Sequence, residues 1–379
     1  MTASSAQPAL PPIDVRPREE RLWGALQALG VESLYVDNLS HVRWLTGFSG
    51  SAGAAVVVVS SKSIHLLTDS RYRDQSRDEL DEVQSSAEIH MARTSSERID
   101  VASRVVGSAV LALDGSEVSY AFHAEMSAKH AVTMLPSRSP FVELRRVKDD
   151  AEITRMRRAA QIADVALQEV VADGLCGLTE REVRMRLEHS MARHGADAPS
   201  FDTIVATGAN AALPHHGPSS STIEPHHMVI IDMGALVDGY HSDMTRTVCV
   251  GDISEDDHHL LQLVRLSQAA GVDRVKAGER GSAVDAACRD IFEDAEVLDL
   301  YTHGTGHGVG LDIHEEPFFH RATEQTLMTN EVVTVEPGLY RVGVSGVRIE
   351  DLVVVTNSGC QILTNTPKEL SCPPSPRTI

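Results

Sequence analysis

The sequence has few cysteines, a deficit of positive charge and no long apolar run. Its five cysteines are scattered and odd in number, and none forms a CxxC pair. This pattern excludes a disulfide framework and a zinc–thiolate site, and it favours a reducing compartment such as the cytoplasm. The chain holds 34 Lys and Arg residues against 54 Asp and Glu, for a formal net charge of −20. This excess of acidic groups argues against nucleic acid or an anionic membrane as a partner.

Neither end of the sequence has the pattern of a targeting or membrane segment. No apolar stretch approaches the ~20 residues that a membrane span needs, so no membrane partner is expected. The N-terminal segment MTASSAQPALPPIDVRPREE has no basic stretch ahead of an apolar core, so we expect no secretory signal. Its Pro and Ser content predicts a disordered lead over residues 1–15. The segment PKELSCPPSPRTI predicts a loop-like tail over residues 367–379.

The sequence contains enough apolar material for two domains. Its 379 residues are 42% hydrophobic, which suits two domains of ordinary size. Over residues 16–147, short apolar segments alternate with helical spacing, so we expect a small α/β domain. A helix is expected over Arg18–Leu29 with Gly30 as its C-cap, and the short segments expected among the strands are Ser33–Val36, Val42–Leu45, Ala54–Val59, Ile64–Thr68 and Ala109–Leu113.

Residues 148–366 have the pattern of a larger α+β domain. A helix is expected from residue 149 to Val171, because acidic residues open it and apolar residues recur on one face. A second helix is expected from the capping box Thr179–Glu182 to His194. Two further helices, Ser254–Lys276 and Gly281–Ala295, stand beside expected strands at 202–206, 228–235, 244–250, 332–340 and 347–355. Helices grouped beside antiparallel strands are typical of an α+β fold.

The most informative stretch is residues 229–247, where Asp232 directly follows four apolar residues. A partly buried carboxylate must be paired, protonated or bound to a cation. If Asp238-Gly239 forms a two-residue hairpin turn, Asp232 lies opposite Thr245, and Asp243 lies diagonally across on the same face. A three-residue loop would shift the register by one and turn Asp243 away. Two adjacent carboxylates are costly without a cation between them, so this pair is a first indication of a metal site.

Four other places in the same domain hold polar side chains that a protein core does not favour. Taken singly, each has a plain explanation as a hydrogen-bonded loop histidine or a solvent-facing strand glutamate. Together, four carboxylates and one histidine make a mostly oxygen ligand set. Such a set suits two divalent ions of intermediate hardness, Mn²⁺ or Co²⁺, better than tetrahedral zinc. The four places are His303–Gly310 with His314 after it, Thr334–Gly338 around Glu336, Val347–Asp351 around Glu350, and Pro214–Gly217 around His215.

Five sequence contexts, in this order, resemble the pita-bread metallopeptidases of family M24. They are DMGA, SDMTRT, GTGHGVGLDIHEEP, TVEPGLY and VRIED. The segments LSHVRWLTGFSGSAG and TDSRYRDQ, and VELRRVKDDAEITRMRRAA at the domain junction, are similar to the Xaa-Pro peptidases, the aminopeptidase P and prolidase branch. The resemblance covers nearly the whole chain. It implies a catalytic pita-bread domain over residues 148–366, preceded by a creatinase-like α/β domain over residues 16–147.

The resemblance implies a dinuclear metal centre. Its ligands would be Asp232, Asp243, His307, Glu336 and Glu350, with Asp243 and Glu350 bridging the two ions. Mn²⁺ is the favoured metal, and Co²⁺ and Zn²⁺ are alternatives. Water activated by the ions would attack the peptide carbonyl, and Glu336 would carry the proton.

The resemblance also implies residues that contact the substrate. His215 and His314 would position the peptide and stabilise the tetrahedral intermediate. His303 would lie near the proline pocket. Other roles are implied for Arg348 and Tyr340, which would hold the substrate or order the metal shell, and for Phe201, which stands where some relatives have tyrosine and whose role stays open.

The implied substrate is a peptide with proline at its second position. Proline lacks an amide N–H and has a fixed φ, so a shaped apolar pocket is enough to recognise it. The sequence leaves open whether the enzyme is a dipeptidase (prolidase) or an aminopeptidase P, which differ in admitting a chain beyond proline. Chain length favours prolidase, and the GFSGSAG segment favours aminopeptidase P. The resemblance further implies a homodimer.

Two alternatives to a peptidase share the same fold. One is a non-catalytic pita-bread module that binds protein or peptide, and the other is a creatinase-like C–N hydrolase without metals. Members of these kinds lose ligand residues, whereas this chain retains all five together with His215 and His314. The sequence therefore favours the metallopeptidase.

Overall fold

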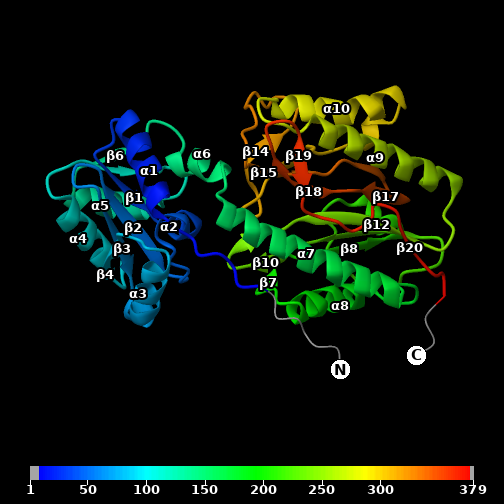
Figure 1. Cartoon of the computed structure of the whole chain (residues 1–379), viewed down its shortest axis with the longest axis horizontal. Coiled ribbons are helices and arrows are strands. Elements are labelled where there is room, and N and C mark those ends of the chain that lie inside the picture. The colour runs from blue at the N-terminus through cyan, green and yellow to red at the C-terminus, as the bar shows by residue number, and fades with distance from the viewer. Residues whose placement is uncertain (1–7, 376–379) are drawn as a thin grey trace. The chain divides into compact units, whose positions relative to one another are not determined.

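A computed structural model describes residues 8–375, and the chain divides into two compact units between Arg145 and Arg146 (Figure 1). The predicted disordered lead lies outside the described residues over positions 1–7, and the predicted tail does so over positions 376–379. Val15 is fully buried, and its N–H donates to the Val83 carbonyl oxygen at 3.2 Å. The described end of the lead is therefore held against the N-terminal unit.

The N-terminal unit has the expected α/β architecture, built on one mixed sheet of strand order β4-β3-β2-β1-β5-β6. The pairs β1–β2 and β2–β3 are antiparallel, and the remaining pairs are parallel. The strands are β1 (Ser33–Val36), β2 (Gly53–Val58), β3 (Ser63–Thr68), β4 (Glu88–Met91), β5 (Leu111–Leu113) and β6 (Val132–Met134). The helices are α1 (Arg16–Ala28), α2 (Leu39–Thr46), η1 (Ser70–Tyr72), α3 (Arg73–Glu82), α4 (Ser95–Val106), α5 (Tyr120–Lys129) and α6 (Pro140–Arg146).

The segment Val42–Leu45, expected among the strands, lies instead in helix α2. The Asn38 side chain caps this helix by accepting from the backbone N–H of His41 at 3.0 Å. Gly47 ends it in the left-handed conformation, with φ of 79°. Three apolar residues around Arg43 fit a buried helix as well as a strand, so the two caps decide the conformation.

The C-terminal unit places helices α7 and α8 on one side of its sheets and α9 and α10 on the other (Figure 1). These helices are α7 (Asp150–Asp173), α8 (Glu180–Arg193), α9 (Glu255–Arg274) and α10 (Gly281–Asp294), with short 3₁₀ helices η2 (Gly208–Ala212) and η3 (Leu298–Leu300). The predicted capping box of α8 is confirmed, because Thr179 and Glu182 each accept a hydrogen bond from the other's backbone N–H. Over residues 8–375, no helix has both the length and the apolar character needed to cross a membrane.

The strands of this unit form four sheets, in the orders β20-β12-β9-β8, β14-β13-β15-β18-β19, β11-β10-β7 and β16-β17. The first half of the strands is β7 (Ala198–Pro199), β8 (Ile204–Thr207), β9 (Met228–Met233), β10 (Ala235–Val237), β11 (Tyr240–His241), β12 (Met244–Val250) and β13 (Gly306–Gly308). The second half is β14 (Glu315–Phe319), β15 (Val332–Val335), β16 (Gly338–Arg341), β17 (Ser345–Arg348), β18 (Asp351–Val355), β19 (Cys360–Ile362) and β20 (Leu370–Cys372). Helices outside and sheets inside give the pita-bread arrangement.

The hairpin that carries the two aspartates has the register expected for a two-residue turn. Asp238 and Gly239 both have positive φ, 46° and 74°, and Asp232 pairs with Thr245. The hairpin passes from one sheet to another at Gly234, so residues 228–235 are not one continuous strand. A Cβ at Gly234 would lie 1.8 Å from the Ser242 carbonyl oxygen, so only glycine permits this crossing.

The long strands expected at 332–340 and 347–355 are each broken at a glutamate. Glu336 lies between β15 and β16, and Glu350 lies between β17 and β18. Pro337 follows Glu336 and has no N–H to donate to a ladder. Because both glutamates lie outside the strands, the direction of their side chains is not fixed by the alternation of side chains between the two faces of a sheet.

The predicted loop-like tail contains a short strand. Residues 370–372 pair in parallel with residues 248–250 of β12. A strand of three residues within a polar, proline-rich segment has too little alternation to stand out from the sequence. The pairing fastens the chain's last described segment to the sheet that carries Asp232.

We expect the substitution Arg246→Ala to lower the free energy of unfolding of the C-terminal unit by about 3–5 kcal/mol, because it leaves a buried carboxylate without its guanidinium. Arg246 is fully buried, and its Nη2 donates to Asp351 Oδ1 at 2.8 Å. Burial alone would raise the pKa of Asp351, but the cations of Arg246 and Lys368 hold it below its usual value. The stabilisation is therefore present above the ordinary pKa of aspartate and is lost as the pH falls toward the lowered one.

Urea unfolding at neutral pH measures this effect. A matched control is Arg265→Ala, since Arg265 pairs with Glu369 at 3.3 Å on the surface and should cost less than about 1 kcal/mol. Equal losses for the two variants would contradict a special role for the buried pair.

Candidate metal centre and substrate cavity

One cavity in the C-terminal unit gathers nearly all of the side chains singled out in the sequence. Its volume is about 400 Å³, which suits a small ligand. The polar lining consists of His215, Asp232, Asp243, His303, His307, His314, Glu336, Arg348 and Glu350, and the apolar lining includes Phe201, Ile204, Pro214, Ile313 and Phe318. Residues from both large sheets and from the intervening loops therefore meet at one place.

The two hairpin aspartates enter the cavity from β9 and from the residue before β12. Asp232 Oδ2 accepts a hydrogen bond from Arg348 Nη2 at 2.7 Å. Asp232 Oδ1 is buried and has no hydrogen-bond partner among the described residues. Asp243 is 5% exposed. A buried carboxylate oxygen normally has a hydrogen-bond donor or a bound cation, so the Asp232 oxygen without a donor is suited to bind a cation.

His307 lies on β13 and faces the carboxylates. Its Nδ1–H donates to the Gly308 carbonyl oxygen at 2.9 Å, which leaves the Nε2 lone pair for a ligand. Nε2 lies 3.6 Å from Asp243 Oδ2 and 3.5 Å from Glu336 Oε1. Asp243, His307 and Glu350 each offer one ligand atom, and these three atoms lie within 4.8 Å of one another.

The backbone and a hydroxyl group hold these ligands in place. A Cβ at Gly306 would lie 2.1 Å from the Thr334 carbonyl oxygen, so glycine allows β13 to approach β15 closely. The hydroxyl of Thr245 donates to Glu350 Oε2 at 2.8 Å. Thr245 is also the residue opposite Asp232 in the hairpin. The pair β9–β12 therefore positions both Asp232 and Glu350.

The electrostatics of the carboxylates fit a cation site. Burial, together with repulsion from Glu350, Asp232 and Glu336, raises the pKa of Asp243 well above its usual value. Burial, together with repulsion from Glu336 and Asp232, raises the pKa of Glu350 well above its usual value. Burial raises the pKa of Glu336 to about 7, and burial lowers the pKa of His307 to about 4. Divalent cations would relieve the repulsion and bind a neutral imidazole, so the residues present fit a metal centre.

The remaining histidines lie around this centre. The His314 ring lies 4.5 Å from the His307 ring, measured between centroids. His215 lines the same cavity from the segment after η2. His303 Nδ1 donates to the Gly304 carbonyl oxygen at 2.7 Å, and its Nε2 lies 2.8 Å from the Tyr340 hydroxyl.

Arg348 and Tyr340 have different positions in the site. Arg348 lines the cavity and donates to Asp232, to the Thr245 hydroxyl at 3.1 Å and to the Tyr340 hydroxyl at 2.9 Å. Tyr340 is 3% exposed and is not among the cavity-lining residues. Of the two roles implied for this pair, ordering the metal shell fits the observed hydrogen bonds.

A buried glutamate that no sequence pattern indicates holds the loop carrying His215. Glu180, the first residue of α8, is fully buried, and its Oε2 lies 2.8 Å from His216 Nε2. The same carboxylate accepts from the backbone N–H groups of Thr207 and Ser219. The position next to a cap predicts a helix start, and only the contact at a separation of 36 residues reveals the second role.

An α+β unit that brings four carboxylates, two of them buried, and a buried histidine to one cavity has the side chains expected of a metal-dependent hydrolase. Comparison with known proteins narrows this class. The sequence model of metallopeptidase family M24 matches residues 154–357, and that of the creatinase/prolidase N-terminal domain matches residues 18–147. The chain belongs to metallopeptidase family M24, with the pita-bread fold, and is a metal-dependent peptidase.

Several relatives and solved structures align over almost the whole chain. An uncharacterized peptidase of Bacillus subtilis, YqhT, is 35% identical over 93% of this chain and 98% of its own length. A Pyrococcus horikoshii Xaa-Pro dipeptidase is 30% identical over 90% of this chain and 94% of its own. Among solved structures, the Xaa-Pro dipeptidase from Bacillus anthracis has a TM-score of 0.89 and 33% identity, covering 95% of this chain and all of that one. The X-Pro aminopeptidase from Thermotoga maritima has a TM-score of 0.84 and 30% identity, covering 94% of this chain and 99% of that one.

Proposed function

We propose that this chain is a dinuclear metallopeptidase that hydrolyses the bond between an N-terminal residue and a following proline, in dipeptides or at the start of longer peptides. The observation that carries the proposal is the meeting of four carboxylates, His307 and an apolar wall in one cavity. Relatives named Xaa-Pro dipeptidase and X-Pro aminopeptidase support the substrate class.

The proposed metal ligands are the five residues whose sequence contexts match the family. Four carboxylates suit two divalent ions of intermediate hardness, so we favour Mn²⁺, with Co²⁺ or Zn²⁺ as alternatives. When bound, a pair of such ions supplies a nucleophilic water near neutral pH and polarises the carbonyl that is attacked. The residues that would hold the ions are Asp232, Asp243, His307, Glu336 and Glu350.

The chain's own residues handle the protons and the developing charge. The Glu336 carboxylate takes the proton of the attacking water and delivers it to the nitrogen of the leaving proline. His314 and His215 direct ring N–H groups to the carbonyl oxygen, which gains negative charge as the tetrahedral intermediate forms. Arg348 holds Asp232 in place, because its Nη2 donates a hydrogen bond to Asp232 Oδ2.

The apolar part of the cavity is the proposed proline pocket. Phe201, Ile204, Ile313 and Phe318 contribute apolar surface beside the carboxylates. Since proline offers no N–H, such a wall selects it by shape. His303 lies at the same cavity and is placed to bound the pocket.

The proposed setting of the enzyme is the cytoplasm, where it would act as a homodimer. All five cysteines are free thiols, which supports a reducing compartment and hence the cytoplasm. The proposed homodimer rests on the resemblance to the family. A non-catalytic binding module is disfavoured because the cavity retains the complete ligand set.

The test is hydrolysis of Ala-Pro and Ala-Pro-Ala by protein loaded with Mn²⁺, with Ala-Ala-Ala as the matched peptide without proline. We expect cleavage before proline and at least about tenfold slower cleavage of the control, since apolar pockets discriminate by roughly 10–200-fold per group. Cleavage of Ala-Pro alone identifies a dipeptidase, and cleavage of the tripeptide identifies an aminopeptidase. Failure to cleave either proline peptide would refute the proposal in favour of the binding module.

A further inference from the structure

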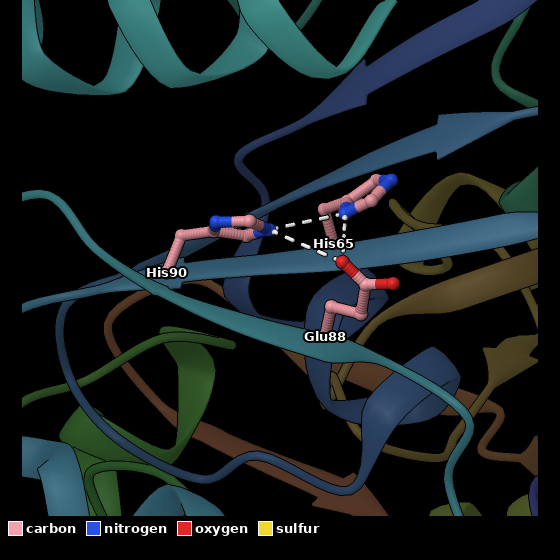
Figure 2. Close-up of side chains that lie close together, drawn as sticks. All are labelled: His65, Glu88 and His90. Carbon is pink, nitrogen blue, oxygen red and sulfur yellow. Dashed lines mark hydrogen bonds and ion pairs between the residues drawn. The ribbon is translucent and has the colours of Figure 1, made fainter.

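A cluster of two histidines and a glutamate lies on the sheet of the N-terminal unit, within a part of the chain that the peptidase mechanism does not use. His65 belongs to β3, and Glu88 and His90 belong to β4. Figure 2 shows that the two imidazole rings and the carboxylate point toward one common place. One ligand atom from each residue lies within 4.8 Å of the other two.

The strand register explains why these side chains meet. Glu88 and His90 are two residues apart on β4, so they lie on the same face of the sheet. β3 and β4 run parallel, and His65 is the residue directly paired with Glu88. All three side chains therefore rise from one face of two neighbouring strands.

The distances between the three donor atoms match those of a small tetrahedral ion. His65 Nδ1 lies 3.1 Å from His90 Nε2 and 3.5 Å from Glu88 Oε2, and the latter two atoms are 4.0 Å apart. In a tetrahedral zinc site, with ligand atoms about 2.0–2.1 Å from the ion, neighbouring ligand atoms lie about 3.3–3.4 Å apart. The three observed distances, from 3.1 to 4.0 Å, include that spacing.

An outer hydrogen bond orients the most buried ligand. The His65 side chain is 9% exposed, and its Nε2 lies 3.0 Å from the Ser63 hydroxyl. That hydroxyl in turn lies 2.8 Å from the Ser61 hydroxyl. With the Nε2–H donated to Ser63, the Nδ1 lone pair of His65 points toward the other two residues, which is the usual arrangement around a metal-bound histidine.

We propose that His65, Glu88 and His90 form a binding site for a divalent transition metal of the zinc class, separate from the catalytic centre. Two imidazoles and one carboxylate are the ligand types that such ions take in proteins. The Glu88 side chain is 70% exposed, so water fills the remaining coordination position.

The metal has a structural consequence for the sheet. β4 is an edge strand, and η1 and α3 lie in the connection between it and β3. An ion held by both strands closes this connection and fastens the edge strand to its neighbour. The site therefore acts as a clip within the N-terminal unit.

The experiment strips the full-length protein of metal with a chelator, adds Zn²⁺, removes the excess by dialysis and counts the zinc bound by wild type, H90Q and E88Q. The control is H123Q, because His123 is another half-buried histidine of the same unit. It lies on α5, and its Nε2 is 3.5 Å from the Ser127 hydroxyl. We expect wild type and H123Q to bind one more Zn²⁺ per chain than H90Q. E88Q should bind the extra ion more than about tenfold more weakly, since loss of even an outer hydrogen bond costs 10–100-fold.

The outcome is independent of the peptidase, because none of these residues lies in the catalytic cavity. Peptide hydrolysis with Mn²⁺ should be equal in all four proteins. Equal zinc content in wild type and H90Q would overturn the proposal and leave a hydrogen bond between two histidines. A matching loss of zinc in H123Q would overturn it as well, since the effect would not belong to the cluster.

Discussion

Replacing Asp243 by alanine is expected to lower turnover by more than about 1,000-fold while leaving the fold intact. Loss of an outer partner of a metal ligand already costs about 10–100-fold in activity, and Asp243 is proposed to be a direct ligand. The fold should survive because Asp243 is a buried carboxylate repelled by its neighbours, and its pKa is raised for that reason. Its removal relieves repulsion in the metal-free protein.

Three measurements check this result together: peptide hydrolysis with added Mn²⁺, metal content and the thermal transition. Asp243→Asn keeps the size of the side chain and should be nearly as inactive, since a neutral amide is a poorer ligand for a divalent cation than a carboxylate. Asp256→Ala is the control, because that side chain is 88% exposed at the start of α9. Unchanged kinetics in Asp243→Ala would refute the metal assignment.

Replacing His314 by alanine is expected to lower kcat by about 100–1,000-fold, the usual cost of removing one donor to a developing oxyanion. Burial and the neighbouring His215 lower the pKa of His314, so its ring is neutral at pH 7 and donates one N–H. The ring packs against His307 without being one of the proposed ligands. Metal content and KM should therefore change far less than kcat.

Steady-state kinetics and metal analysis of the same preparation separate this role from a structural one. His259→Ala is a suitable control, because His259 is exposed on α9. A fall in metal content parallel to the fall in kcat would contradict the assigned role and would make His314 part of the metal shell. The same comparison for His215 tests whether the two histidines share the task.

The chemistry of the site was largely predictable because its residues stand in local patterns. The Asp238-Gly239 turn fixed the hairpin register, so the pairing of Asp232 with Thr245 followed from two residues of sequence. The breaks at Glu336 and Glu350 were not foreseen, since apolar runs on both sides suggested continuous strands. The roles of the individual residues stay predictions that the substitutions above will test.

Contacts between distant segments could not be predicted in the same way. Glu180 and His216 are joined across 36 residues, and each alone looks like an ordinary cap or loop residue. The apolar wall of the cavity combines side chains from separate loops, including Ile204 and Phe318. Predicting the cluster around His65 requires the register of the parallel strands β3 and β4. The sequence does not give this register, because η1 and α3 separate the two strands.

The central claim is that the cavity residues act through bound divalent metal. The most direct test removes metal with a chelator and then restores Mn²⁺ in measured amounts, following cleavage of Ala-Pro and Ala-Pro-Ala and the manganese bound per chain. Since the cluster around His65 is also proposed to bind metal, the titration uses the H90Q variant. The account predicts no turnover after chelation and full recovery when two ions are bound. Full turnover by the metal-free protein would contradict it.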